Sequence, residues 1–393
     1  MRSSALRSGT VSFGTNVRFG SQTLTRPLAV IGHRRTSVVD CVSVQRSNVM
    51  SALQSMLGIE LPVIQAPMAG VQDEVLALAV SEAGGLGSMP CALLSSAQLE
   101  SALERFATAP RPINLNFFCH SMAAPDPAHE QRWREALAPY YDELEIEPPE
   151  PTTAGARQPI DEPTVALLEQ YRPKVVSFHF GLPPPHLLQR IKAWGAAILA
   201  SATTLEEGRW LESNGADVVI AQGIEAGGHR GHFLSPDLAR QPPTRELVAQ
   251  LSRALAVPIV AAGGVASRTD VEALLDAGAS AIQAGTAYLL CPEATTTAVH
   301  RAALRQGSTA TAVTNLFSGR PARGLMNRLM RELGPLSDLP PAFPWASQAL
   351  MPLRARAEAL GRDDFTPLWS GTKPGIFRNV DAAAVTRELA GHG

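Results

Sequence analysis

Short apolar runs alternate with longer amphipathic stretches along the chain from Leu61 onward. This alternation is typical of a parallel sheet whose strands are joined by covering helices. The apolar runs predict eight strands, at residues 62–66, 85–89, 113–118, 175–180, 197–202, 217–221, 258–262 and 281–285. The amphipathic stretches predict helices between them, for example at residues 96–106, 185–194, 204–213, 245–254 and 269–277. Eight such units predict an α/β fold of the TIM (β/α)8 barrel type, and no dinucleotide-binding pattern of glycines follows the first strand.

Three segments fall outside this repeat. Residues 1–49 are rich in Arg, Ser and Thr and poor in acids, as expected of a transit peptide, a disordered tail, or sequence upstream of a true start at Met50. The barrel is predicted over residues 50–310, with a proline- and acid-rich insertion at about 121–163 that suits a lid or an accessory helix. Residues 311–393 run past the eighth unit and are expected to form a C-terminal extension that packs on the barrel.

The composition is that of an ordinary globular protein, and it adds mainly exclusions. With 34 basic and 36 acidic residues the net charge is −2, so no nucleic-acid partner is expected. No apolar run approaches the length that spans a bilayer, so no membrane partner is expected either. The four cysteines lie far apart without a C-x-x-C pair, which predicts no zinc site, no disulfide framework and a cytoplasmic location. Small molecules remain as partners, and the sequence leaves both a monomer and a dimer open.

Two glycine turns follow the last two predicted strands. Gly263 and Gly264 come directly after the strand at 258–262, and Gly285 repeats the design one unit later. Turns without side chains let backbone N–H groups approach a phosphate, and the seventh and eighth loops of a barrel frequently hold one. The alternative is that these glycines only make tight turns. The position of both turns favours a phosphate site.

A third glycine-rich loop, AQGIEAGGHRGH at 221–232, begins with the side-chain amide of Gln222. An amide that both donates and accepts suits the polar edge or ribityl chain of a flavin, and Gly227 lets the backbone approach a ligand. His229 and His232 have a spacing that a metal site can use, but no third ligand is apparent. We therefore expect no metal here.

His179 stands near the end of the fourth predicted strand, and alternation places it on the face opposite Phe178 and Phe180. In an arbitrary protein a histidine in an apolar strand is a core residue with one hydrogen bond. At the mouth of a barrel, where catalytic residues lie, a general base is the better hypothesis. Asn116 ends the preceding strand and is expected at the same mouth, and His120 is the next candidate for a base.

Together these stretches resemble the nitronate monooxygenase family, formerly called 2-nitropropane dioxygenases. The matching stretches are QAPMAG at 65–70, NLNFFCH at 114–120, SFHFG at 177–181, SATTLEEGRWLESNGAD at 201–217, AQGIEAGGHRG at 221–231, AAGGV at 261–265, QAGTAY at 283–288 and FSGRPARGL at 317–325. They extend from residue 50 to about 330, and the SFHFG stretch is similar to class I members.

The resemblance implies a barrel that binds FMN without a covalent bond. It implies that the flavin phosphate lies on the glycine turns, and that the ring lies near the first, third and sixth strand ends. The phosphate residues would be Gly263, Gly264, Gly285 and Thr286, with Ala287 and Tyr288 following in the same turn. The ring residues would be Met68, Asn116, Gln222 and Gly227.

The resemblance also implies that His179 is the catalytic residue, which removes the α-proton of a neutral nitroalkane and helps to position an anionic nitronate. A histidine with a pKa near neutrality suits that task, and the redox step belongs to the cofactor. The implied reaction oxidises alkyl nitronates, such as propionate 3-nitronate, with O2 to a carbonyl compound and nitrite.

Two other functions fit the same loops. One is an FMN-dependent reductase that passes hydride from NAD(P)H to a quinone or an enoyl thioester. The other is a barrel that binds FMN or a sugar phosphate without catalysis. Anaerobic bleaching of the flavin by NAD(P)H would favour the reductase, and oxygen consumption with propionate 3-nitronate would separate the monooxygenase from the binding protein.

Overall fold

The structure is a computed structural model that describes residues 52–150, 157–307, 310–374 and 380–392. All of these residues belong to one unit. Residues 1–49, which the sequence suggests are a transit peptide, a tail or upstream sequence, lie outside the described residues. The division of the chain into an N-terminal extension, a barrel and a C-terminal extension stays a prediction.

Eight parallel strands form a ring in the order β1-β9-β8-β6-β5-β4-β3-β2. A bridge between Ile64 and Leu86 joins its two ends. The strands are β1 Val63–Gln65, β2 Gly87–Pro90, β3 Ile113–Phe118, β4 Val175–His179, β5 Ala197–Ala202, β6 Val218–Gln222, β8 Ile259–Ala262 and β9 Ala281–Ala284. The predicted TIM barrel is confirmed, and every predicted strand is present within about two residues of its expected bounds.

Helices cover the outside of the ring, and the five that the sequence predicted are present. The α-helices are α2 Glu74–Glu82, α3 Ser96–Ala107, α4 Pro127–Glu143, α5 Glu162–Tyr171, α6 Pro185–Ala193, α7 Leu205–Ser213, α8 Thr244–Ala254, α9 Arg268–Asp276, α10 Ala298–Arg305, α11 Arg328–Glu332, α12 Met351–Ala359 and α13 Ala382–Ala390. Short 3-10 helices are η1 Leu238–Arg240, η2 Thr286–Tyr288 and η3 Trp345–Leu350. Most α-helices begin at a side chain that caps the first turn, such as Ser95 at α3 and Ser267 at α9.

The eighth covering helix comes from the far end of the chain. α13 packs against α2 and α9 and contacts β1, so it occupies the position between the first and last strand–helix units. Its Thr386 shares a hydrogen bond of 3.0 Å with the Tyr288 hydroxyl after β9. The last unit of the barrel is therefore completed only after a long intervening segment that leaves the barrel and returns.

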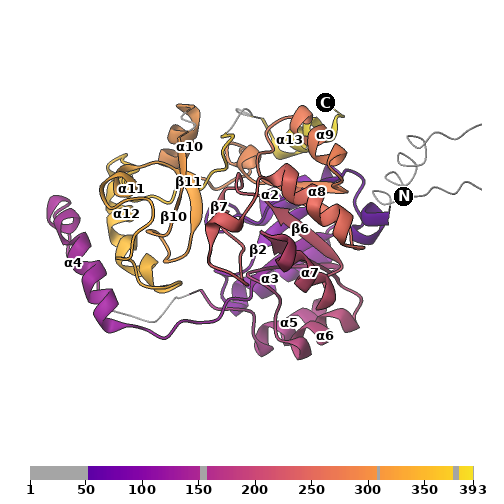
Figure 1. Ribbon diagram of the computed structural model, residues 1–393, viewed down its shortest axis with the longest axis horizontal. Helices are drawn as coiled ribbons and strands as arrows, with labels where there is room; N and C mark the ends of the chain where they lie inside the picture. Colours follow the sequence, from indigo (N-terminus) through magenta and orange to yellow (C-terminus); the bar gives the residue numbers. More distant parts are fainter. Residues whose placement is uncertain (1–51, 151–156, 308–309, 375–379, 393) are drawn as a thin grey trace, which may run out of the picture. The chain divides into compact units, whose positions relative to one another are not determined.

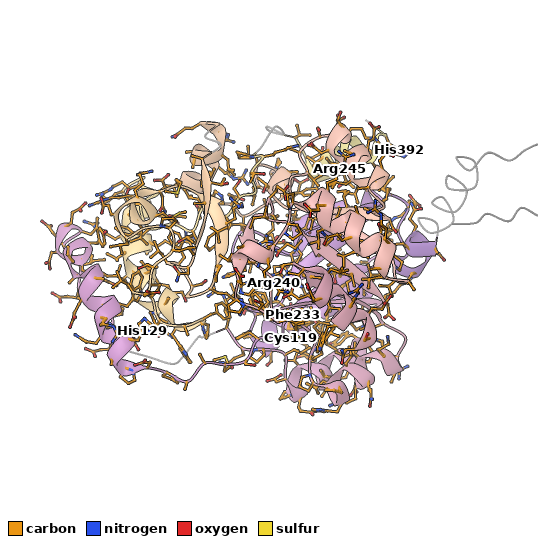
Figure 2. The ribbon with its side chains drawn as sticks, in the orientation of Figure 1. Cys119, His129, Phe233, Arg240, Arg245 and His392 are labelled. Carbon is orange, nitrogen blue, oxygen red and sulfur yellow. The ribbon has the colours of Figure 1, made fainter. Side chains whose placement is uncertain are left out.

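That intervening segment builds a second core together with the insertion. Apolar residues of α4, including Trp133 and Tyr141, pack against residues of the region 316–365, and the α4 helix lies beside α11 and α12 in Figure 1. The indole of Trp133 donates to the Ala346 carbonyl at 3.1 Å. His129, labelled in Figure 2, donates to the Asp338 carbonyl at 2.8 Å. The apolar face of α4 is thus covered by the C-terminal segment.

A small antiparallel sheet connects this segment to the barrel loops. Its strands are β10 Thr311–Thr314, β11 Ala322–Leu325 and β7 Gly228–His229, in the order β10-β11-β7. β7 belongs to the glycine-rich loop after β6, and it pairs with β11. The C-terminal segment is therefore hydrogen-bonded to a loop of the barrel mouth.

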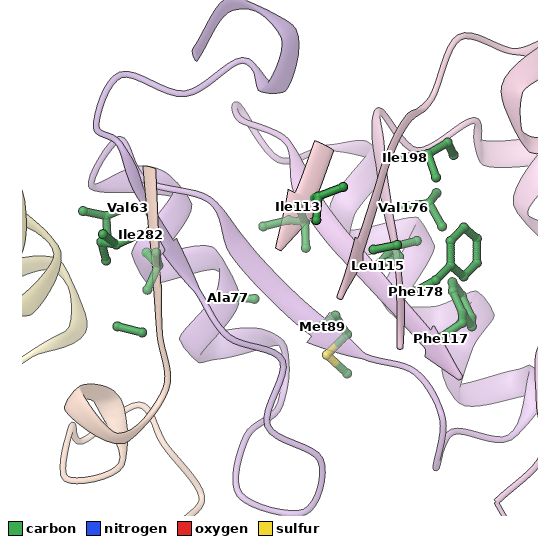
Figure 3. Packing of buried hydrophobic residues seen from close by; sticks show 14 of the residues in the cluster. Val63, Ala77, Met89, Ile113, Leu115, Phe117, Val176, Phe178, Ile198 and Ile282 are labelled. Carbon is green, nitrogen blue, oxygen red and sulfur yellow. The ribbon is translucent and has the colours of Figure 1, made fainter. Parts of the chain in front are cut away.

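Alternation along the barrel strands separates an outer core from the interior. Figure 3 shows part of the outer core, in which Val176 and Phe178 of β4 pack with Leu115 and Phe117 of β3. The other face of the strands points inward. A separate apolar cluster that includes Val175, Leu199 and Val260 fills the start of the interior. Polar side chains replace it toward the strands' carboxyl ends, which is where a site can form.

Candidate active site

A cavity of about 1400 Å³, its open mouth included, lies at the carboxyl ends of the barrel strands. Its lining comes from nearly every strand end and from the insertion and C-terminal segments. Nine of the residues predicted for the site lie in its wall, namely Met68, Asn116, His179, Gln222, Gly227, Gly263, Gly264, Gly285 and Thr286. The sequence-based selection of these residues therefore corresponds to one place in the fold.

One wall of the cavity has the geometry of an anion cradle. Gly263 and Gly264 have positive φ angles of 121° and 70°, and a Cβ on Gly263 would lie 2.8 Å from the Ala226 nitrogen. Within the described part of the chain, the N–H groups of Gly263, Gly264 and Gly285 donate to no protein acceptor. Helix α9 begins directly after the first turn, so its positive end also faces this region. Free N–H donors and a helix N-terminus fit a phosphate.

Ala287 and Tyr288 were predicted for the same turn, but they do not line the cavity. Both are buried, and the Tyr288 ring belongs to the core between the barrel and its helices. Its hydroxyl is occupied by Thr386. Any contact of these two residues with a ligand would have to come from their backbone groups, and their role in a cofactor site stays a prediction.

Gln222 holds a loop of the cavity wall. Its Nε2 donates to the His229 carbonyl at 2.9 Å, and its Oε1 accepts from the Gly231 N–H at 2.7 Å. Behind it, the fully buried Arg230 donates to the carbonyls of Gln222 and Gly223. The amide that the sequence suggested for a flavin edge is therefore engaged in fixing the β7 loop.

The first loop of the barrel is held by a similar amide network. Gln72 Oε1 accepts from the Met68 N–H at 2.7 Å, and Gln72 Nε2 donates to the Ser88 carbonyl at 2.7 Å. Gln65 completes the network by donating to Gln72 and accepting from the Ser88 N–H. The loop that carries Met68 into the cavity wall is thus fixed to β2.

Two further amides stand at neighbouring strand ends. Asn116 donates to the Ser177 hydroxyl at 2.9 Å, which ties β3 to β4 at the cavity wall. Gln283 on β9 also lines the cavity, and its buried Oε1 has no partner among the described residues. A buried amide oxygen without a donor is costly, so this atom is suited to accept a hydrogen bond from a bound molecule. The sequence reading did not single out Gln283.

His179 projects into the cavity from the end of β4. Its Nε2 donates to the His229 carbonyl at 3.2 Å, which leaves Nδ1 as the nitrogen with a free electron pair. Burial, with a smaller contribution from the Arg320 charge, lowers the pKa of His179 to about 3. The expected pKa near neutrality is wrong for this arrangement: His179 is a neutral and weak base at physiological pH.

The surroundings of His179 are aromatic and cationic. Phe118 and Phe180 lie with ring centroids 4.9 Å apart, and the Arg320 guanidinium lies 4.0 Å from the centroid of Phe180. His229 lines the same side of the cavity, and its Nε2 and the Ser318 hydroxyl are 2.8 Å apart. Burial and the neighbouring Arg157 charge hold the pKa of His229 well below its usual range. This side of the cavity favours anions over cations.

Several lining residues come from outside the strand ends and glycine turns on which the predicted site was based. Arg157 comes from the insertion, and Trp369, Gly371 and Lys373 come from the C-terminal segment. A Cβ on Gly227 would lie 2.5 Å from the Gly371 nitrogen, which explains the glycine at that position. No local pattern distinguishes these residues, because they reach the cavity only through the second core.

His120, the reserve candidate for a base, does not line the cavity. Its Nε2 donates to the Arg157 carbonyl at 3.2 Å, and burial lowers its pKa to about 4. Among the described residues no group of three His, Cys, Asp or Glu side chains is arranged to hold a metal ion. None of the described helices is both long and apolar enough to cross a membrane.

The fold and the cavity define a class of protein: an α/β barrel in which a cradle of free N–H groups faces a histidine across the mouth. The sequence profile of the nitronate monooxygenase family matches residues 50–388. The chain is 41% identical over 339 residues to a nitronate monooxygenase of Pseudomonas aeruginosa, across 85% of this chain and 96% of that protein. A nitronate monooxygenase of Paraburkholderia phytofirmans is 37% identical, across 86% of this chain and 93% of the other.

A comparison with solved structures indicates the same family as the sequence comparison. The crystal structure of nitroalkane oxidase from Streptomyces ansochromogenes superposes with a TM-score of 0.78 and 36% identity, across 87% of this chain and 97% of that chain. The chain belongs to the nitronate monooxygenase family, and it is an oxidoreductase.

Proposed function

We propose that this chain is an FMN-dependent nitronate monooxygenase that converts an alkyl nitronate and O2 into a carbonyl compound and nitrite. The main support for this proposal is that a glycine cradle and a histidine face each other across one cavity. In the ring of eight strands β9 and β4 lie four places apart, so the cradle at Gly285 and the imidazole of His179 stand on opposite sides of the mouth. A cofactor held by its phosphate at one side would extend toward the base at the other.

The residues of the cradle suit FMN. The free N–H groups of Gly263, Gly264 and Gly285 would hold its phosphate. The unpaired Oε1 of Gln283 would accept a hydrogen bond from an N–H or O–H group elsewhere on the cofactor. Bound FMN would supply the redox chemistry, by taking electrons from the substrate and reacting with O2. The chain itself contributes binding, orientation and control of one proton.

The low pKa of His179 bears on the substrate. A neutral nitroalkane must lose a C–H proton before it can be oxidised, and a base with a pKa of about 3 is poorly matched to that step. A nitronate has already lost this proton and needs only to be bound and oriented. The arrangement therefore supports preformed nitronates as the better substrates, with His179 as a neutral group that contacts them.

We also propose a cytoplasmic location, which rests on cysteine usage. Cys91, Cys119 and Cys291 are free thiols, and burial raises the pKa of Cys91 and of Cys291 to about 12. Such thiols are unreactive toward exchange and give no sign of oxidative folding.

The absorption spectrum of the purified protein tests the cofactor. We expect flavin bands, and FMN rather than FAD after denaturation. Under anaerobic conditions propionate 3-nitronate should bleach the flavin rapidly, and NAD(P)H should bleach it slowly or not at all. A colourless protein that FMN cannot reconstitute would contradict the proposal, and rapid bleaching by NAD(P)H alone would favour a reductase.

A further inference from the structure

Arg157 is a cation in the cavity wall whose backbone is fixed beside β3. Its carbonyl accepts from His120 Nε2 at 3.2 Å, and three residues later the Ile160 N–H donates to the Phe118 carbonyl at 2.9 Å. The chain returning from the insertion is thus fastened to the end of β3, on the His179 side of the cavity. This fixes the point from which the side chain reaches into the cavity.

The guanidinium of Arg157 has no carboxylate partner in the described part of the chain. Its one hydrogen bond there is a long one, 3.4 Å from Nη1 to the Ser347 hydroxyl. The charged neighbour that acts on it is another cation, Arg354, which is itself paired with Glu358 at 2.8 Å. Burial lowers the pKa of Arg157. A half-buried cation without a counter-ion destabilises the protein by its desolvation free energy, and a bound anion would offset that free energy.

Two other cations near the cavity differ from Arg157. Lys373 lines the cavity but donates to the Asp270 carboxylate, next to the glycine cradle. Arg320 donates to the His232 carbonyl and stacks on Phe180, but it is absent from the cavity wall. Arg157 is therefore the cavity-lining cation on the His179 side that has guanidinium N–H groups to spare for a ligand.

We propose that Arg157 binds a second anionic group of the substrate, a carboxylate, so that the site prefers nitronates that carry a carboxylate over simple alkyl nitronates. The planar guanidinium offers paired N–H donors that match a carboxylate. The nitronate end of the same molecule would lie toward His179 and the cofactor. This inference rests on the proposed function and adds a specificity-determining residue to it.

The kinetic test compares two nitronates in two variants. Arg157→Gln should lower kcat/KM for propionate 3-nitronate by about 10²-fold, mainly through KM, because a charge-assisted hydrogen-bonded pair is lost. The value for propyl-1-nitronate, which lacks the carboxylate, should change by less than about threefold. Arg354→Gln removes a neighbouring charge outside the cavity wall and should leave both values nearly unchanged. Equal losses on both nitronates, or no loss on either, would overturn the inference.

An equilibrium test keeps the inference separate from the proposed function. Calorimetry with 3-nitropropionate, which carries the carboxylate but need not react, should show at least tenfold weaker binding to Arg157→Gln than to the wild-type protein. The affinity of Arg157→Lys should lie between those two values. Binding that is unchanged in Arg157→Gln would overturn the assignment of Arg157 whether or not nitronates are oxidised. A wild-type enzyme that binds 3-nitropropionate through Arg157 yet oxidises no nitronate would instead refute the proposed function.

Discussion

Substitutions at Gly264 separate backbone strain from charge at the proposed phosphate cradle. Gly264 has φ of 70°, and the nearest atoms to a new Cβ are Cβ and Cγ of Glu225 at 3.5 and 3.7 Å, which is ordinary contact. Gly264→Ala should therefore cost only the left-handed backbone strain, about 1–2 kcal/mol of stability. Gly264→Asn and Gly264→Asp add side chains of equal size and differ by one charge. That difference isolates the electrostatic effect on the cofactor.

The expected size of the charge effect follows from Coulomb's law. A carboxylate about 5 Å from a phosphate charge, at an effective dielectric constant of about 20, is repelled by about 3 kcal/mol, or roughly 10²-fold in affinity. Titration of the flavin-free variants with FMN, followed by quenching of flavin fluorescence, measures this ratio. We expect Gly264→Asp to bind FMN at least about 10²-fold more weakly than Gly264→Asn. Equal dissociation constants for the two variants would show that the phosphate lies elsewhere.

Three further predictions concern the base, the acid stability and the start of the chain. A Cβ on Gly231 would lie 2.7 Å from Cε1 of His179, so Gly231→Ala should displace the imidazole and lower kcat/KM by about 10-fold or more. Gly228→Ala meets no atom within 4 Å and adds only the backbone strain of its φ of 73°, so it should lower kcat/KM less. Five enclosed histidines whose pKa burial lowers stay neutral in the folded chain while the unfolded chain takes up protons below about pH 6.5. Each contributes up to about 1.4 kcal/mol per pH unit, so the free energy of unfolding, from urea titrations, should fall by about 6 kcal/mol per pH unit near pH 5. These histidines are His120, His179, His229, His232 and His300. A stability that does not fall on acidification would contradict that assignment. A chain that starts at Met50 keeps the two fully buried leucines of residues 52–57, so it should keep its flavin and its turnover. Aggregation or loss of flavin in this shortened chain would show that residues 1–49 contribute to the fold.

The barrel was predictable because its strands carry a local signal. β3 and β5 have the predicted bounds, since each is a short run of residues that are all buried. The bounds of α2 were not predicted, because its sequence EVLALAVSE is nearly continuous in apolar residues and gives little helical alternation. α13 was not predicted as a barrel helix, because its position against α2 and α9 depends on where the C-terminal segment returns.

The residues of the candidate site were predictable where they stand at strand ends or in glycine turns. His179 and the cradle glycines stand in the cavity because parallel strands bring their carboxyl ends together. The engagement of Gln222 with the β7 loop and the low pKa of His179 depend on burial and on loop contacts, which the sequence does not display. Arg157 enters the wall through tertiary contacts alone. Two signals in the sequence indicate the helix in the insertion: Asp126 and Pro127 at its start, and the spacing of Trp133 with other apolar residues of α4.

Oxygen consumption by the purified, FMN-loaded protein with propionate 3-nitronate measures the proposed activity directly. We expect rapid uptake of O2 with nitrite released in step, above the rate of free FMN. In His179→Asn the flavin should be retained and the rate with this nitronate reduced only moderately, because the imidazole contacts the substrate as a neutral group and removes no proton from it. No nitronate-dependent oxygen uptake by the yellow wild-type protein would contradict the account.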